Sequence, residues 1–313
     1  MIHLKLLIVL FIMVGAAVPG RCADNAAGGG PVAILLSDSE AAYSQPLTAF
    51  SEEIGRPVVV FNLHGAIEKD PQLKSRLFAA KPAMIFALGA KAAFVAKLWT
   101  ADHQDIPVIF AMVLNWQHYN LLDQPNLTGI ASEMAPGTQF VNMTMFSPKI
   151  KKIGVVFSDY SSHFVAEAKR AADLLGLQLV NIPIQHPEEF GRAFKKLAPE
   201  IDAFWVLSDP VVYTLENVDW LEDRCVKERL LCMGQSANIV KLGMVLAVNP
   251  DPINIGSQAA SMAKNILDGR LKPQDIGVMD PLGTKIFVNL KTAGRIGLEV
   301  DQAALDMASQ VID

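Results

Sequence analysis

The 313-residue sequence has few of the patterns that mark enzymes, metalloproteins or nucleic-acid-binding proteins. Its six histidines are scattered, and none has a partner at the spacing of metal ligands. The chain contains no Gly-x-Ser-x-Gly nucleophile motif, no phosphate-binding P-loop and no Cys-x-x-Cys pair. Its formal net charge of −5 provides no positive surface for nucleic acid. The sequence therefore predicts a protein that is not an enzyme, needs no cofactor and has no nucleic-acid partner.

Long apolar runs are also scarce, and only the N-terminal region has one. Residues 6–18 have the sequence LLIVLFIMVGAAV, with Lys5 before them and Pro19-Gly20 after them. A membrane-spanning helix needs about 20 apolar residues, so this pattern predicts a signal peptide over residues 1–23. An uncleaved anchor helix is the alternative. Cleavage removes two basic residues and no acidic one, which changes the net charge from −5 to −7 and leaves a periplasmic or otherwise extracytoplasmic protein.

Cysteine is the third scarce feature, with three in the chain. Cys22 follows Arg21, whereas a lipoprotein signal needs a small residue at that place, so we expect ordinary cleavage between Gly20 and Ala23. Cys225 and Cys232 then remain, on either side of a predicted helix-to-strand turn. Two cysteines in an oxidising compartment can pair, so we predict a disulfide between them, with two reduced, buried thiols as the alternative.

What the chain does contain is a series of short apolar runs that end at small polar residues. Runs of this length suit parallel strands buried on both faces, and most of them precede helical stretches. The pattern predicts an α/β fold with two Rossmann-like lobes, each built on a parallel sheet, joined by hinge crossovers. The first set of runs begins at Pro31, Pro82 and Ile106, and the second set begins at Lys152, Asp202 and Met244.

The expected domain limits follow from these two sets and from Pro148, because a proline disfavours helix at the residue before it. Residues 24–30, DNAAGGG, are small and predict a flexible tether. We expect a first lobe over 31–147 with a helix at about 252–268 added to it. We expect a second lobe over 148–250 with the C-terminal segment of about 273–313 added to it.

Ligands of open α/β sheets lie beyond the carboxyl ends of the strands, so the residues there are the candidate ligand contacts. Hydroxyls, carboxylates and free helix amides suit a small polar solute, although simple helix capping is the alternative role for each. Gly89 and Ala90 open a predicted helix whose amides could receive a carboxylate, since no arginine stands at a strand end to do so. The polar candidates are Ser37, Asp38, Ser39, Ser158, Asp159, Ser208, Asp209, Ser236, Asn249 and Asp251, and the larger side chains are Tyr43, Met112, Trp116, Tyr119 and Tyr160.

Two sets of these candidates leave alternatives open. Trp116 and Tyr119 suit an aromatic lid or wall over a ligand, with core packing or a surface loop as the alternative. Asp38, Asp159 and Asp209 form a conceivable metal-binding set, but carboxylates at strand ends more often cap helices, so we expect no metal site.

Several strings in the chain resemble, in order, the ABC-transporter substrate-binding protein family that includes tryptophan- and tyrosine-binding members. These strings are LGAKAAF at Leu88, IPVIFAMV at Ile106, PNLTGI at Pro125, SPKIKKIGVVFSD at Ser147, GSQAASMAKNILDG at Gly256 and FVNLKTAGRIGLEV at Phe287. The resemblance covers nearly the whole mature chain and implies a type I periplasmic-binding-protein fold. The chain departs from the family at residues 114–120, LNWQHYN, where the family usually has an Asp-Pro turn followed by a Gly-Leu-Val stretch.

The resemblance implies a monomeric solute-binding protein of an ABC importer. Such a protein captures a small molecule between its lobes and delivers it to a separate membrane permease. The family favours an amino acid, and an aromatic one in particular, as the ligand. Two alternatives remain: a periplasmic module of the same fold that signals to a membrane sensor, and a two-domain α/β enzyme, for which the chain lacks a nucleophile or base constellation.

Overall fold

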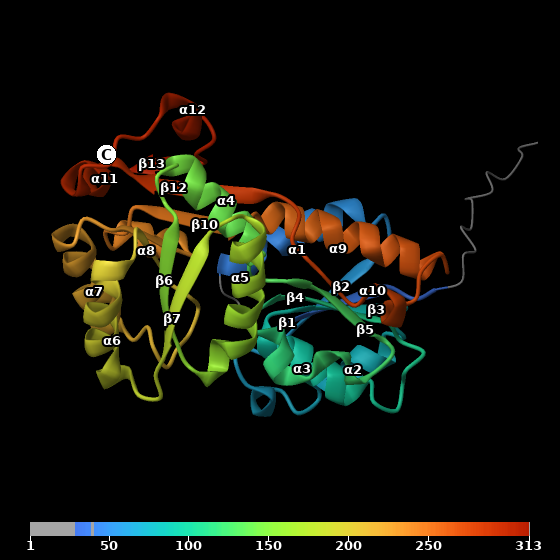
Figure 1. The fold of residues 1–313 in the computed structure, drawn as a ribbon. Helices are drawn as coiled ribbons and strands as arrows, with labels where there is room; N and C mark the ends of the chain where they lie inside the picture. Colours follow the sequence, from blue (N-terminus) through green and yellow to red (C-terminus); the bar gives the residue numbers. More distant parts are fainter. Residues whose placement is uncertain (1–28, 39–40, 313) are drawn as a thin grey trace, which may run out of the picture.

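The structure is a computed structural model that describes residues 29–38 and 41–312. The predicted signal peptide, residues 24–28 of the predicted tether, and Ser39 lie outside the described residues. The described residues form two α/β lobes that lie side by side, and each lobe is a sheet covered by helices on both faces (Figure 1). The predicted α/β class with two mainly parallel sheets is confirmed.

The first sheet has the strand order β11-β5-β4-β3-β1-β2, and all its pairs are parallel. The inner strands β1 and β3 are wholly buried, which explains why their sequences are continuous apolar runs. The strands are β1 (Val32–Leu36), β2 (Val58–Asn62), β3 (Met84–Leu88), β4 (Val108–Val113), β5 (Leu127–Ala131) and β11 (Val278–Met279).

Helices cover both faces of the first sheet. One face carries α1 and α9, whose buried residues Phe50 and Ala259 share one apolar cluster with Ile34 of β1. The opposite face carries α2 and α3. The helices of this lobe are α1 (Ser44–Glu53), α2 (Leu73–Ala79), α3 (Ala90–Trp99), α9 (Pro252–Leu267) and α10 (Pro273–Ile276), with short 3₁₀ helices η1 (Ala41–Tyr43), η2 (Ile67–Lys69), η3 (Trp116–Tyr119) and η4 (Leu121–Asp123).

The second sheet has the strand order β13-β12-β10-β9-β8-β6-β7. Its neighbouring strands are parallel except for β10 and β12, which pair antiparallel. The strands are β6 (Lys152–Phe157), β7 (Gln178–Pro183), β8 (Ala203–Trp205), β9 (Leu231–Gly234), β10 (Leu246–Pro250), β12 (Thr284–Asn289) and β13 (Gln310–Ile312).

The second sheet is also covered on both faces. On one face, α4 and α5 pack around the buried Trp205, whose indole Nε1 donates to Oε1 of Gln139 at 2.8 Å. On the other face, α6 and α7 bury a cluster of phenylalanines. The helices of this lobe are α4 (Pro136–Phe146), α5 (Ser162–Leu174), α6 (Phe190–Leu197), α7 (Leu215–Lys227), α8 (Ala237–Lys241), α11 (Leu290–Ile296) and α12 (Gln302–Leu305), with η5 (Asp159–Ser161), η6 (Pro187–Glu189) and η7 (Ala198–Glu200).

Within the described residues the chain crosses between the lobes three times. The first crossing follows β5 at residues 132–135, the second joins β10 to α9, and the third joins β11 to β12 at residues 280–283. We call the first and third of these segments connector 1 and connector 3. Side chains from the lobes fasten both connectors: Gln139 Nε2 donates to the carbonyl of Met134 at 2.7 Å, and Gln258 Nε2 donates to the carbonyl of Asp280 at 3.0 Å.

Two of the expected domain limits need correction. The boundary predicted at Pro148 places helix α4 in the first lobe, but its Phe140 and Phe146 pack in the core of the second lobe. The segment from Pro273 is expected in the second lobe, but α10 precedes β11, which pairs with β5 of the first sheet. The first crossing therefore comes before α4, and the last one comes after Met279.

Two further features concern the cysteines and the membrane. Cys225 near the end of α7 and Cys232 in β9 are joined by a disulfide, with their Cα atoms 6.2 Å apart. Among the described residues, no helix combines the length and the apolar character that a membrane span requires.

Candidate functional site

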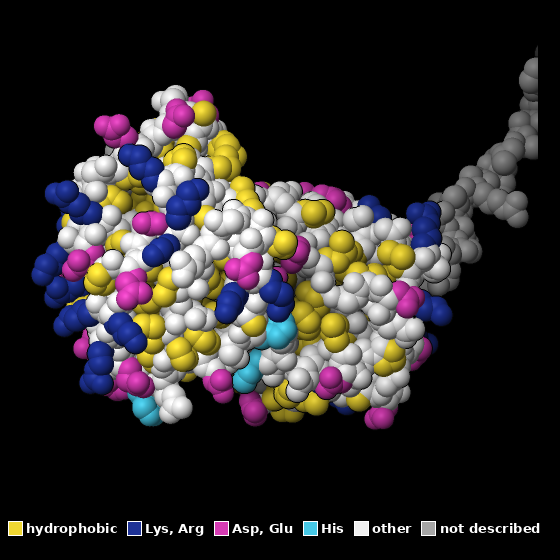
Figure 2. Space-filling view, viewed as in Figure 1, with side chains coloured by type: hydrophobic (Ala, Val, Ile, Leu, Met, Phe, Trp, Pro, Cys, Tyr) yellow, Lys and Arg dark blue, Asp and Glu magenta, His cyan; other side chains and the backbone are white. Residues whose placement is uncertain are grey.

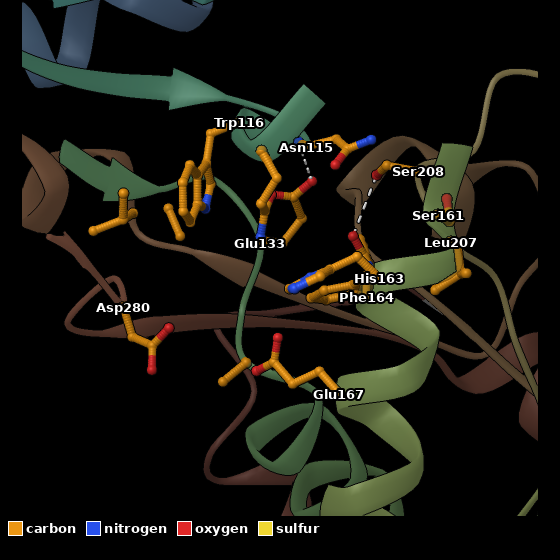
Figure 3. A pocket seen from close by; sticks show the side chains of 15 residues that line it. Asn115, Trp116, Glu133, Ser161, His163, Phe164, Glu167, Leu207, Ser208 and Asp280 are labelled. Carbon is orange, nitrogen blue, oxygen red and sulfur yellow. Dashed lines mark hydrogen bonds between the residues drawn. The ribbon is translucent and has the colours of Figure 1, made fainter. Parts of the chain in front are cut away.

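A cavity of about 230 Å³ lies between the lobes. Its lining comes from both lobes and from connectors 1 and 3, at the carboxyl ends of β4, β5, β8 and β9 (Figure 3). This is the place where open α/β sheets bind ligands. The lining residues are Asn115, Trp116, Gln117, Ala131, Glu133, Ala135, Ser161, His163, Phe164, Glu167, Leu207, Ser208, Gln235, Val278 and Asp280.

Asn115 joins the first lobe to connector 1 and to the second lobe. It has a left-handed backbone with φ +46°, which asparagine adopts more readily than most residues. Its backbone N–H donates to Oε1 of Glu133 at 2.8 Å, and its side-chain Nδ2 donates to the carbonyl of Tyr160 at 2.6 Å. The segment that departs from the family pattern therefore bridges the lobes at the cavity wall.

Glu133 is the strongly perturbed carboxyl group of the cavity. Burial raises its pKa from 4.5 to about 7, although the hydrogen bonds from the backbone N–H groups of Asn115 and of Glu133 itself act in the opposite direction. Desolvation outweighs these bonds because it penalises the charged carboxylate. Glu133 is therefore partly protonated near neutral pH, which is typical of groups at functional sites.

Two aromatic side chains form walls of the cavity. Trp116 comes from η3 and packs against Phe110 of the first lobe, with ring centroids 6.4 Å apart. Phe164 comes from α5 and packs against Trp205 of the second lobe, at 5.6 Å. Each wall is thus fixed to the core of its own lobe, which gives a ligand one rigid apolar surface on each side.

The polar lining is acidic and contains an unpaired amide. Glu167 of α5 and Asp280 of connector 3 face the cavity together with Glu133 (Figure 3). On the far wall the hydroxyl of Ser208 donates to Oε1 of Gln235 at 3.2 Å. The Nε2 atom of Gln235 is buried and has no hydrogen-bond partner among the described residues. A buried donor without a partner is costly, so this amide suits a ligand that brings an acceptor.

The structure brings two of the predicted ligand contacts, Trp116 and Ser208, into the cavity. Tyr160 and Asp209 line a neighbouring hollow between the lobes, together with Leu114 and Leu207. Tyr119 lies next to the site, where it makes an edge contact with His118.

Asp209 is held by its own lobe. The side chain is buried, and its carboxylate accepts from the N–H and the hydroxyl of Ser158 at 2.8 and 2.9 Å and from the N–H of Val211 at 3.1 Å. Burial and the nearby carboxylate raise the pKa of Tyr213 well above its usual value. The hydrogen bonds between Asp209 and Ser158 join the ends of β6 and β8, so both residues have a structural role here.

The predicted residues around β1 and β3 also form a local structure. Buried Ser37 accepts from the N–H of Ala92 at 2.9 Å, which caps the first turn of α3 beyond Gly89 and Ala90. Gly89 has φ +89°, and a Cβ there would lie 2.4 Å from the Tyr43 hydroxyl and 2.5 Å from Ser37 Oγ. Asp38 lies beside Gly65. These residues are not among those that line the cavity.

The remaining predicted residues lie outside the cavity lining. Ser236 and Asp251 cap helices, since their side chains accept from the N–H groups two residues further on. Asp251 also pairs with Lys285 at 3.4 Å. Asp159 is exposed, Met112 lies in β4 with φ +58°, and Asn249 has a buried Oδ1 without a partner among the described residues.

The cavity also contains residues that are not among the contacts predicted from the sequence: Glu133, Phe164, Glu167, Gln235 and Asp280. Glu133 and Asp280 lie just after β5 and β11, so strand ends were a signal, but β11 has two residues and no detectable pattern. Phe164 and Glu167 lie on one helix, three residues apart, and so share a face. Among the described residues, no group of three or more His, Cys, Asp or Glu side chains has the arrangement of a metal site.

A comparison with protein-family models gives a match. A family model described as ABC transporter substrate binding protein matches residues 53–312. No curated protein sequence matches the chain.

Solved structures with the same fold cover nearly the whole chain. A ligand-free, open structure of a substrate binding protein with adhesive properties from Clostridium difficile is 20% identical, with a TM-score of 0.74 over 90% of this chain and 99% of that one. The ABC domain in complex with L-Trp from Streptococcus pneumoniae is 20% identical, with a TM-score of 0.61 over 91% of this chain and 100% of that one. A conserved domain protein from Vibrio cholerae is 18% identical, with a TM-score of 0.60 over the same shares, 91% and 100%. These likenesses confirm the type I periplasmic-binding-protein fold.

Proposed function

Because the chain belongs to the ABC transporter substrate binding protein family, we propose that it is the exported solute-binding protein of an ABC importer. In this role it captures a small organic solute in the cavity between its lobes. It then presents the solute to a membrane permease, which is a separate chain. It is monomeric and carries out no chemistry on the solute.

The observation that carries this proposal is the composition of the cavity wall. Trp116 belongs to the first lobe, Phe164 belongs to the second, and Glu133 lies on connector 1. A ligand that touches all three favours one arrangement of the two lobes over others, and a ligand shifts a conformational equilibrium by as much as its affinities for the two states differ. A permease can then distinguish the loaded protein from the empty one by its shape.

The aromatic walls favour a ligand with a flat or aromatic body. The resemblance to a family with tryptophan- and tyrosine-binding members favours an amino acid.

Export places the protein outside the cytoplasm, where it can deliver the solute to the membrane permease. The apolar N-terminal run predicts cleavage of residues 1–23, and intact-mass measurement of protein secreted by a bacterial host tests this part. A mass that includes the first 18 residues would contradict it.

A ligand screen tests the function itself. Purified residues 24–313 are heated with a panel of amines, amino acids, sugars and carboxylates, because a ligand that binds only the folded state raises the melting temperature. Hits are then titrated by calorimetry into the wild type and Trp116→Ala, with Phe94→Ala as the control, since Phe94 is an exposed aromatic residue of α3 outside the cavity. We expect tenfold or greater weakening for Trp116→Ala alone. Equal affinity of all three proteins would contradict the placement of the site.

A further inference from the structure

The charges around the interlobe cavity restrict the chemistry of its ligand. We propose that the solute is a small organic cation, with a protonated amine or ammonium group, a flat or aromatic body and no carboxylate. This inference rests on the proposed function, because it assigns the ligand class of the same site.

Three carboxyl groups from three separate segments surround the cavity. Glu133 comes from connector 1, Glu167 from α5 and Asp280 from connector 3 (Figure 3). No lysine or arginine of the described residues lines the cavity, and His163 is its single basic side chain. Within the same residues, none of the three carboxyl groups forms an ion pair. Negative charge that is not balanced by a nearby positive side chain attracts a cation into a partly closed site and disfavours an anion there.

The lysine and arginine side chains of the described residues lie outside the cavity lining. Lysine and arginine side chains gather on the outer part of the second lobe over α6 and α7 (Figure 2). The acidic cavity is therefore a local property and does not simply follow from the net charge of the chain.

The aromatic walls suit the same ligand. A cation next to the face of an indole or phenyl ring gains an additional electrostatic attraction, and this gain is larger where water is excluded. Trp116 and Phe164 supply one such ring from each lobe. Because no three acidic or histidine side chains of the described residues form a metal-binding arrangement, an organic cation fits these walls better than a metal ion does.

A free amino acid fits the cavity less well. Its carboxylate is held most strongly by an arginine or a lysine, and no lysine or arginine of the described residues lines the cavity. Among the described residues that line the cavity, Nε2 of Gln235 is a buried side-chain donor without a partner, and it matches a single neutral acceptor such as a hydroxyl or carbonyl group. The first turn of α3, which was the candidate receiver of a carboxylate, is capped by Ser37 and does not line the cavity.

The protonation of Glu133 couples cation binding to pH. The titratable groups that share the cavity lining with Glu133 are Glu167, Asp280 and His163, and Tyr160 interacts with it electrostatically. A bound cation favours the ionised carboxylate, so binding releases a proton from Glu133 and becomes tighter as pH rises from about 6 to about 8. A carboxylate-bearing ligand would show the opposite dependence, because it binds better next to a neutral acid.

Matched pairs of probes test the proposal. Tryptamine, tyramine and phenethylamine are compared with L-tryptophan, L-tyrosine and L-phenylalanine, since the members of each pair differ only in the α-carboxylate. We expect the amines to raise the melting temperature and to bind at least tenfold more tightly than their amino acids at pH 8. Calorimetry in buffers of different ionisation enthalpy measures the proton released.

Variants identify the groups responsible. Glu133→Gln and Glu167→Gln keep the size of each side chain and remove its charge, and each is expected to weaken amine binding about tenfold or more. Glu299→Gln, at an exposed carboxylate outside the cavity, is the control and should leave binding unchanged. Tighter binding of the amino acids, with affinity still lost in Trp116→Ala, would overturn the cation assignment and leave the proposed function standing. Probe binding that no cavity variant changes would contradict both.

Discussion

Removing the charge of Glu133 is expected to change how the stability of the empty protein depends on pH. Burial raises the pKa of this carboxyl group from 4.5 to about 7, so the folded state holds its proton more tightly than the unfolded state does. Between these two values the folded protein binds more protons, and its free energy of unfolding therefore falls as pH rises. The stabilisation is complete below about pH 4.5 and is lost as pH passes through about 7.

The size of the effect follows from the two pKa values. Each pKa unit corresponds to about 1.4 kcal/mol, so the wild type is expected to lose about 3 kcal/mol from this group between pH 4.5 and pH 8.5. Glu133→Gln has no such proton to lose, and its Oε1 can still accept from the N–H of Asn115. We therefore expect alkaline pH to lower the free energy of unfolding of Glu133→Gln less than that of the wild type. The difference in favour of the variant should grow to about 3 kcal/mol at pH 8.5.

Urea unfolding of ligand-free protein at several pH values from 5 to 8.5 measures this difference. Glu299→Gln, with its exposed side chain, serves as the matched control and should follow the wild type. If the free energies of unfolding of the wild type and Glu133→Gln differ by the same amount at every pH in this range, the reasoning is refuted. A carboxyl pKa below 5 for Glu133, measured by NMR, would refute it as well.

Two further predictions concern the second lobe. Asp209→Ala removes the acceptor for the N–H groups of Ser158 and Val211. The loss of these buried hydrogen bonds should lower the free energy of unfolding, measured with urea, by about 2–4 kcal/mol. An unchanged free energy of unfolding would show that the bonds are not needed. In exported protein, Cys225 and Cys232 should yield no free thiol under denaturing, non-reducing conditions, and two titrated thiols would contradict the disulfide. Replacing both cysteines by serine should lower the free energy of unfolding by about 2–3 kcal/mol, because the cross-link closes a short loop.

The sequence predicts the strands well because their burial imposes a pattern that is visible locally. Strands such as Val32–Leu36 and Met84–Leu88 are buried on both faces, so every position is apolar and the run stands out. The lobe to which residues 136–146 belong is harder to predict, because the apolar side chains of helix α4 show that it packs in a core but do not show in which one. Strand β11 was missed since two residues are too few to carry any periodicity.

The site was predictable only in part for a similar reason. The rule that ligands lie beyond strand ends found Trp116 and Ser208. The same rule also selected Asp209, whose carboxylate is satisfied by Ser158 at the end of a neighbouring strand. Glu133 and Asp280 belong to the connectors, and their approach to one cavity depends on how the two lobes are placed, which no local pattern encodes.

A crystal structure of residues 24–313 with the tightest ligand of the screen tests the central claim most directly. We expect ligand density between the lobes, in contact with Trp116 and Phe164 and with an ammonium group beside Glu133. Density at another place, such as the first turn of α3 next to Gly89, would contradict the claim that this cavity captures the solute.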